Sequence, residues 1–276
     1  MSPDSGLSIL HLVLLLLAIG GAGGFLSGLL GVGGGILFVP ALFFAMTALG
    51  FDGQHAMHIA VATSLLIVLA TGATSAIAHY RRGGVEMVRV RAWGPYILAG
   101  VVAGALFASN IDGAVLKRVF AVITLLISVY MAFGRERSSS DAVAFLTPKI
   151  QHILCIGIGM VSSMIGVGGA ILTVPMMSYC GMTMQKAIGT GAALGVVISL
   201  PGTLGYMVGG MLHDIAGLPP YSIGYVNFIA AGMIVPTAML LAPVGVKISH
   251  AMPRLMLRRV FAVVLVIVSA RMFMSF

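Results

Sequence analysis

The chain has 276 residues, of which 59% are hydrophobic and only 8% are charged, and its formal net charge is +8 at neutral pH. Soluble domains carry about 25% charged residues, because water has to solvate their surface. This composition excludes a soluble domain and indicates an all-α, polytopic membrane protein, in which the excess of basic residues records membrane orientation.

Apolar segments of helical length follow one another along the whole chain, five in the first half and five in the second. Eight to ten membrane crossings are expected, depending on whether the two segments that begin with glycine cross the bilayer or re-enter. The ten segments lie near 7–28, 32–49, 55–79, 92–110, 114–133, 150–165, 167–183, 187–210, 223–246 and 256–275.

The second half of the chain repeats the first. The stretch GFLSGLLGVGGGILFVP at 24–40 agrees with GMVSSMIGVGGAILTVP at 159–175 in ten of 17 positions, and LKRVFAV at 116–122 agrees with LRRVFAV at 257–263 in six of seven. Because both matches occur in the same order, each half contains a whole copy of one unit. We predict a first membrane repeat over 1–134, a polar linker over 135–149 and a second membrane repeat over 150–276.

Basic residues indicate how the two repeats are oriented. If all ten segments cross the membrane, the 15 Lys and Arg residues divide 12 to 3 between its two sides, whereas eight crossings divide them 8 to 7. Cytoplasmic loops are enriched in Lys and Arg, so the first count is favoured, and five crossings per repeat give the repeats opposite orientations. We therefore expect an inverted repeat in a bacterial-type inner (plasma) membrane, with both termini outside and the basic loops, such as 81–91, in the cytoplasm.

Glycine-rich phrases, GVGGG at 31–35 and GVGGA at 166–170, open the second segment of each repeat. Glycine permits backbone angles that other residues avoid, and transporters built from inverted repeats bind substrate at broken helices near the bilayer midplane. The N-terminus of such a half-helix carries partial positive charge that suits an anion. The alternative is close helix packing through small residues. The candidate site glycines are Gly31, Gly33, Gly34, Gly166, Gly168 and Gly169.

Hydroxyl side chains near these phrases could donate hydrogen bonds to an anion without placing a charge in the membrane. Their alternative is a bond to a carbonyl of their own helix. His58 and Asn227 are candidates for proton transfer or gating, with an interfacial or structural role as the alternative. The candidate hydroxyls are Ser27, Ser162 and Ser163 before the breaks and Thr63, Ser64 and Thr190 in the third segment of each repeat.

The sequence lacks the residues and motifs that other functional classes require. All seven acidic residues fall in termini or predicted loops, so no carboxylate inside the membrane can hold a cation or relay a proton. The sequence has no zinc-ligand spacing, phosphate-binding loop or nucleophile motif, and we interpret Cys155 and Cys180 as small buried hydrophobes. We expect no catalytic residue, metal, cofactor or nucleic-acid partner; the expected partners are a small anionic substrate and the lipid bilayer.

With these motifs the chain resembles the TauE/SafE family of membrane permeases, also called the sulfite exporter family. The resemblance covers nearly the whole chain and is carried by both glycine phrases, AVATSLL at 60–66, SLPGT at 199–203 and IGYVN at 223–227. One stretch departs from it, because Gly191 follows Thr190 where the family pattern has a Thr-Ser pair. The resemblance implies export or uptake of a small sulfur-containing anion, such as sulfite, sulfoacetate or another sulfonate.

Three alternatives to such a transporter are a permease for a non-sulfur anion such as a carboxylate, an intramembrane enzyme, and a non-transporting scaffold. An enzyme would need a nucleophile with a base, or metal ligands, at one depth, and the seven histidines lie mostly near segment ends. A scaffold would not need a doubled helix break at its centre. The sequence therefore favours a transporter that works by alternating access between its two halves.

Overall fold

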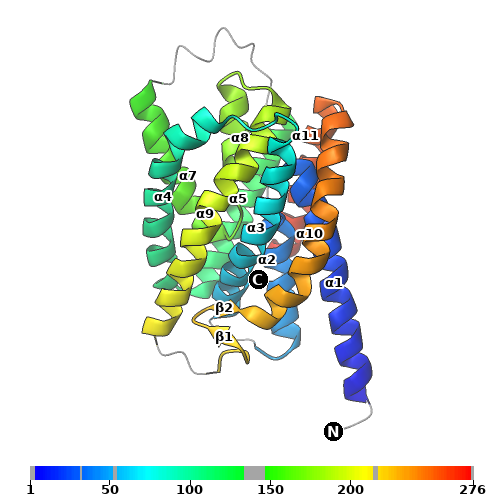
Figure 1. Cartoon of the computed structure of the whole chain (residues 1–276). Coiled ribbons are helices and arrows are strands. Elements are labelled where there is room, and N and C mark those ends of the chain that lie inside the picture. Colours follow the sequence, from blue (N-terminus) through cyan, green and yellow to red (C-terminus); the bar gives the residue numbers. More distant parts are fainter. Residues whose placement is uncertain (1–3, 32, 52–54, 134–146, 214–216, 275–276) are drawn as a thin grey trace.

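The computed structural model describes residues 4–31, 33–51, 55–133, 147–213 and 217–274. Within these ranges the chain forms a bundle of ten α-helices and one short antiparallel β-hairpin (Figure 1). The first half contains α1 (Asp4–Leu30), α2 (Gly35–Ala48), α3 (Ala56–Tyr80), α4 (Met87–Ser109) and α5 (Gly113–Phe133). The second half contains α7 (Pro148–Ile165), α8 (Ala170–Tyr179), α9 (Met184–Leu212), β1 (Ser222–Ile223), β2 (Val226–Asn227), α10 (Phe228–Ala251) and α11 (Arg254–Phe273).

Each of the ten apolar segments expected from the sequence corresponds to one of these helices. The largest difference at a helix start within the first half is in α4, which begins at Met87 instead of near 92 and so includes Arg89 and Arg91. Long basic side chains can keep their charged heads in water while their stems lie along an apolar helix, so a helix can extend past the apolar run. Most of the expected linker, residues 135–146, lies outside the described residues.

Glycines end the first helix of each half. After α1, Gly31 and Gly33 have φ angles of 69° and 74°, and α2 starts after Gly34 with φ 79°. In the second half, α7 ends at Gly166 with φ 68°, and α8 starts after Gly169 with φ 50°. Glycine adopts such angles at little steric cost, so the phrase itself makes the chain leave the helix. We call Gly31, Gly33 and Gly34 the first break and residues 166–169 the second break.

The short helices α2 and α8 turn back instead of crossing the bundle. They have 14 and 10 residues, and at about 1.5 Å per residue they are roughly 21 and 15 Å long, which is less than the ~30 Å hydrocarbon core of a bilayer. The lengths of α2 and α8 are thus those expected if the two segments that begin with glycine re-enter the membrane instead of crossing it. Within the described residues, five helices are long and apolar enough to cross a membrane, namely α1, α3, α4, α9 and α10.

The four most extensive helix contacts all join the two halves: α1 packs along α10, α4 along α7, α3 along α9, and α5 along α11. Glycines allow the first two pairs to approach closely. A Cβ on Gly24 of α1 would collide with the backbone of Ala238 in α10, and a Cβ on Gly100 of α4 would collide with the backbone of Ile156 in α7. Such small-residue contacts are typical of membrane helices, whose association depends on close van der Waals packing.

Successive helices run in alternating directions along the bundle (Figure 1). As a result, most of the described basic residues gather where α3 ends and α4 begins, and we call this the basic end. The residues Lys117, Arg118 and Arg271 lie toward the opposite end, and Arg135 and Arg137 lie outside the described residues. The basic end carries Arg81, Arg82, Arg89, Arg91, Lys149, Lys186, Lys247 and Arg259.

Candidate functional site

The two breaks lie at the same depth, near the centre of the bundle. The first break packs on α3, where a Cβ on Gly33 would meet the side chain of Val68. The second break packs on α9, where a Cβ on Gly169 would meet the side chain of Ile198. Val68 and Ile198 each lie near the middle of their helix. The breaks therefore meet where α3 and α9, the two central helices, pack against each other.

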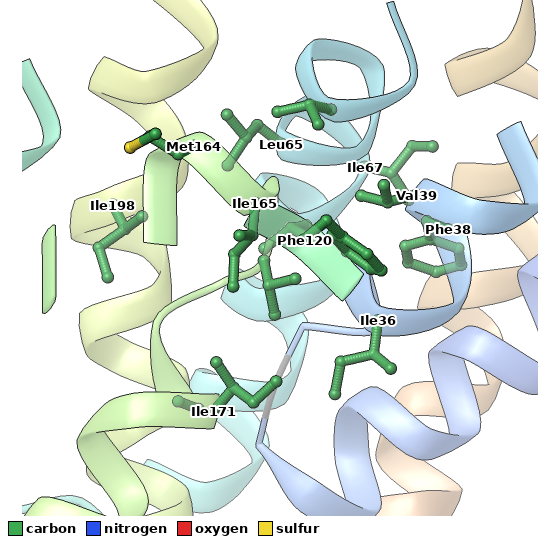
Figure 2. Packing of buried hydrophobic residues seen from close by; sticks show 14 of the residues in the cluster. Ile36, Phe38, Val39, Leu65, Ile67, Phe120, Met164, Ile165, Ile171 and Ile198 are labelled. Atoms are coloured by element: carbon green, nitrogen blue, oxygen red, sulfur yellow. The ribbon is translucent and has the colours of Figure 1, made fainter. Parts of the chain in front are cut away.

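The breaks are in direct contact with each other. A Cβ on Gly35, the first residue of α2, would lie 2.6 Å from the carbonyl oxygen of Gly166 and 2.9 Å from the Cα of Val167. Apolar side chains surround this contact, among them Ile36 of α2 and Ile165 of α7 (Figure 2). The contact leaves no room for a side chain on Gly35, and it holds the start of α2 close to the second break.

From their breaks, α2 and α8 run in opposite directions (Figure 1). The first backbone N–H groups of a helix have no partner within the helix, and they give its N-terminus a partial positive charge. One such terminus is already suited to bind an anion. Two such termini, one after each break, make the breaks a candidate place for an anion.

Polar side chains on one face of α3 hold the breaks in place. Ser64 Oγ donates a hydrogen bond of 2.9 Å to the carbonyl of Gly166, and Thr71 Oγ1 donates one of 2.7 Å to the carbonyl of Gly33. One turn further on, Ser75 Oγ donates to the carbonyl of Ser27 at 3.3 Å. The first half thus supplies the donors for both breaks.

Thr71 and Ser75 were not among the expected site residues. They follow Ser64 at helical spacings of seven and eleven residues, which places them on the same face of α3. That spacing of polar residues in an otherwise apolar segment is the sequence signal that would have revealed them.

Ser27 and Ser162 occupy equivalent positions in the repeat, each a few residues before its break. Both side chains are completely buried, and neither hydroxyl has a hydrogen-bond partner within the described part of the chain. The Ser162 Oγ lies 4.0 Å from the position of a Cβ on Gly169, at the start of α8. A buried hydroxyl without a partner costs free energy, and this makes the two serines candidates for bonding to a ligand.

Ser163 differs from its neighbour. Its Oγ donates to the carbonyl of Met160 at 2.9 Å, within its own helix, and it would collide with a Cβ on Gly104 of α4. This side chain therefore contacts α4, away from the second break. The remaining candidate glycines lie in the breaks, with Gly31 against the carbonyl of Ile188 and Gly168 against Gly195.

Thr63 and Thr190 each hold the start of a helix in the other half. Thr63 Oγ1 of α3 accepts a hydrogen bond of 3.0 Å from the backbone N–H of Asn227, which precedes α10. Thr190 Oγ1 of α9 accepts one of 3.0 Å from the backbone N–H of Glu86, which precedes α4. The two bonds are reciprocal, and the structure does not bring these hydroxyls to the breaks.

His58 and Asn227 lie together at the end of the bundle opposite the basic end. His58 Nε2 is 3.1 Å from the carbonyl oxygen of Ala108, and its ring stacks on Tyr225 with centroids 4.9 Å apart. Asn227 caps α10, because its Oδ1 accepts a hydrogen bond of 2.9 Å from the N–H of Ala230. Both residues make structural contacts remote from the breaks. Within the described residues, no group of three or more His, Cys, Asp or Glu side chains is placed to hold a metal ion.

Comparison with known proteins identifies the family. The model of the family described as "Sulfite exporter TauE/SafE" matches residues 16–272. A probable membrane transporter protein of Haemophilus influenzae is 30% identical over 263 residues, covering 95% of this chain and 98% of the relative. Probable membrane transporter proteins of Methanocaldococcus jannaschii and Bacillus subtilis are 26% and 24% identical, covering 87% and 94% of this chain and 88% and 96% of the relatives. No solved structure matches significantly. The chain belongs to the TauE/SafE family and is a membrane transporter.

Proposed function

We propose that this transporter moves a small sulfur-containing anion, such as sulfite, sulfoacetate or another sulfonate, by alternating access between two inverted repeats. The observation that carries the proposal is the contact between two breaks that each precede a helix N-terminus, together with two buried serine hydroxyls that have no partner in the described part of the chain. In this proposal the glycines supply backbone N–H groups, and the serines supply neutral donors. The proposed binding residues are Ser27, Gly31, Gly33, Gly34, Ser64, Ser162, Gly166, Gly168 and Gly169.

The chemistry of the breaks supports an anion over a cation. Hydroxyl and N–H donors with helix dipoles stabilise negative charge, whereas a cation needs carboxylate or carbonyl oxygens that are free to coordinate it. Ser64 and Thr71 already donate to the carbonyls of Gly166 and Gly33. The description of the matching family as a sulfite exporter supports sulfur as the central atom of that anion.

The pattern of contacts supports an inverted repeat, with 1–134 as the first unit, 135–149 as the linker and 150–276 as the second. The pairing of α1 with α10 mirrors that of α7 with α4, and the bond from Thr63 to the start of α10 mirrors that from Thr190 to the start of α4. The α1–α2 hairpin enters the bundle from one end and the α7–α8 hairpin from the other (Figure 1). Such an arrangement lets each end open in turn around a fixed site.

The proposal is tested by thermal unfolding of the detergent-purified protein with sulfite, thiosulfate, sulfate, sulfoacetate, taurine and acetate. A ligand that binds only the folded protein stabilises it by about 2.7 kcal/mol at 100 times its Kd. We expect a higher Tm with at least one sulfur oxyanion. A shift with acetate alone would replace the substrate class by carboxylates, and no shift with any anion would overturn the proposal.

Serine substitutions locate the site. Ser27→Ala and Ser162→Ala remove hydroxyls that bond to nothing in the described part of the chain, so we expect the Tm without ligand to stay the same or rise slightly, while the ligand-induced shift is lost. Ser163→Ala is the matched control, because its hydroxyl bonds within its own helix, and it should retain the shift. A full shift in both Ser27→Ala and Ser162→Ala would move the site away from the breaks.

A further inference from the structure

His79 and His250 form a pair beside the first break, and the proposed transport scheme does not use it. His79 Nδ1 lies 3.1 Å from His250 Nε2, and His79 Nε2 lies 3.2 Å from the carbonyl oxygen of Gly28. The pair thus joins the end of α3 to the end of α10 and to the last turn of α1, next to Ser27. His79 is completely buried, whereas His250 is half-buried at the basic end, where solvent can reach it.

The partners of the two rings fix their tautomers. A carbonyl only accepts hydrogen bonds, so His79 carries a proton on Nε2 and donates it to Gly28. The Nδ1 of a neutral His79 is then an acceptor, and His250 donates to it from Nε2. The Nδ1 of His250 remains as the basic nitrogen of the pair, and a proton from water can enter there.

The charged groups around the pair are mostly positive. Arg82 acts on both rings. The other charged residues on the elements packed against the pair are Arg81 after α3, Glu86 before α4, Lys186 in α9 and Lys247 in α10, and the last turn of α1 has no titratable side chain. An anion at the first break would therefore be the nearest buried negative charge to an imidazolium at His79, and the two charges would stabilise each other.

We propose that His79 and His250 form a proton-binding site that loads together with the anion, so that proton binding and anion binding are linked; this rests on the proposed function. His250 Nδ1 takes a proton from water at the basic end, and the Nε2 proton of His250 passes to His79 Nδ1. His79 becomes an imidazolium that still donates from Nε2 to Gly28. The proton leaves by the reverse path. Because coupling between two ligands is reciprocal, anion binding raises proton occupancy and a proton raises anion affinity.

Proton uptake on anion binding tests this inference. The purified protein is mixed at pH 6.5 with thiosulfate, an anion that does not itself titrate near neutral pH, in unbuffered detergent solution with a pH-sensitive dye. We expect uptake of up to about one proton per bound anion. His79→Gln should abolish the uptake while a thiosulfate-induced rise in Tm remains, smaller than in the unmodified protein because the proton no longer raises the anion affinity. His152→Gln is the control, because the His152 ring stacks on Tyr96 with centroids 3.8 Å apart and lies on α7, and it should retain full uptake.

The outcomes separate the two proposals. Binding of thiosulfate without proton uptake, or unchanged uptake in His79→Gln, would overturn the proton site and leave the anion site standing. If His79→Gln does not fold, His250→Gln gives the same test, because a glutamine amide can still donate to His79 Nδ1 but cannot pass a proton on. If thiosulfate gives no Tm shift, the measurement is repeated with the sulfur anion that does; no shift with any of them would overturn the proposed function, and the proton site with it.

Discussion

Gly35 is the residue at which the contact between the breaks is most sensitive to change. The Cβ of Gly35→Ala would lie 2.6 Å from the carbonyl oxygen of Gly166, so the start of α2 and the second break would have to move apart. Forcing extra atoms into a packed interior typically costs 1–3 kcal/mol, and we expect roughly that loss. Thermal unfolding in detergent measures it as a lower Tm.

Gly232 of α10 provides the matched control for this change. A Cβ there meets nothing within 4 Å, and replacing a helical glycine by alanine stabilises a helix by up to about 1 kcal/mol. Gly232→Ala should therefore have the same Tm as the unmodified protein or a higher one. Equal stability of Gly35→Ala and Gly232→Ala would mean that the two breaks do not touch.

The sequence predicts the glycines of the site better than its hydroxyls. A positive φ depends on the residue itself, so GVGGG and GVGGA mark the breaks without knowledge of the fold. The direction of a hydroxyl depends on which neighbours pack around it. Ser162 and Ser163 are adjacent and equally polar, yet only one bonds to its own helix, and this difference arises from the packing of α7 against α4.

At the scale of elements, helix order could be read from apolar runs, but helix length could not. The residues after α2 and α8, such as Leu49, Phe51 and Met182, are apolar too, so the runs extend beyond the helices, and the segments were expected to be long enough to cross. The pairing of helices between the halves also required the structure. It depends on glycines such as Gly24 and Gly100, which a sequence contains in many positions without such contacts.

The reciprocal threonine bonds give a test of the coupling between elements. Thr190→Val removes the acceptor for the N–H of Glu86, and we expect faster amide hydrogen exchange at the start of α4 although the change is in α9. Thr63→Val should act in the same way on Asn227 and the start of α10. Mass spectrometry of the exchanged peptides measures both effects. Faster exchange only around the mutated helix would contradict the reciprocal arrangement.

At the scale of the whole molecule, the basic end should face the cytoplasm, because Lys and Arg are enriched on that side of membrane proteins. Cys180 reports this orientation: it follows α8 at the basic end and is half-buried, whereas Cys155 of α7 is fully buried. A membrane-impermeant maleimide should therefore modify Cys180 in inside-out vesicles and leave it unmodified in right-side-out vesicles.

Burial raises the pKa of the Cys180 thiol, and since the thiolate is the nucleophile, modification should speed up as the pH is raised. Cys180→Ala should abolish labelling in both preparations. Modification of Cys180 in right-side-out vesicles would instead place the basic end outside the cell. The two hairpins would then enter the bundle from the opposite sides of the membrane to those expected here.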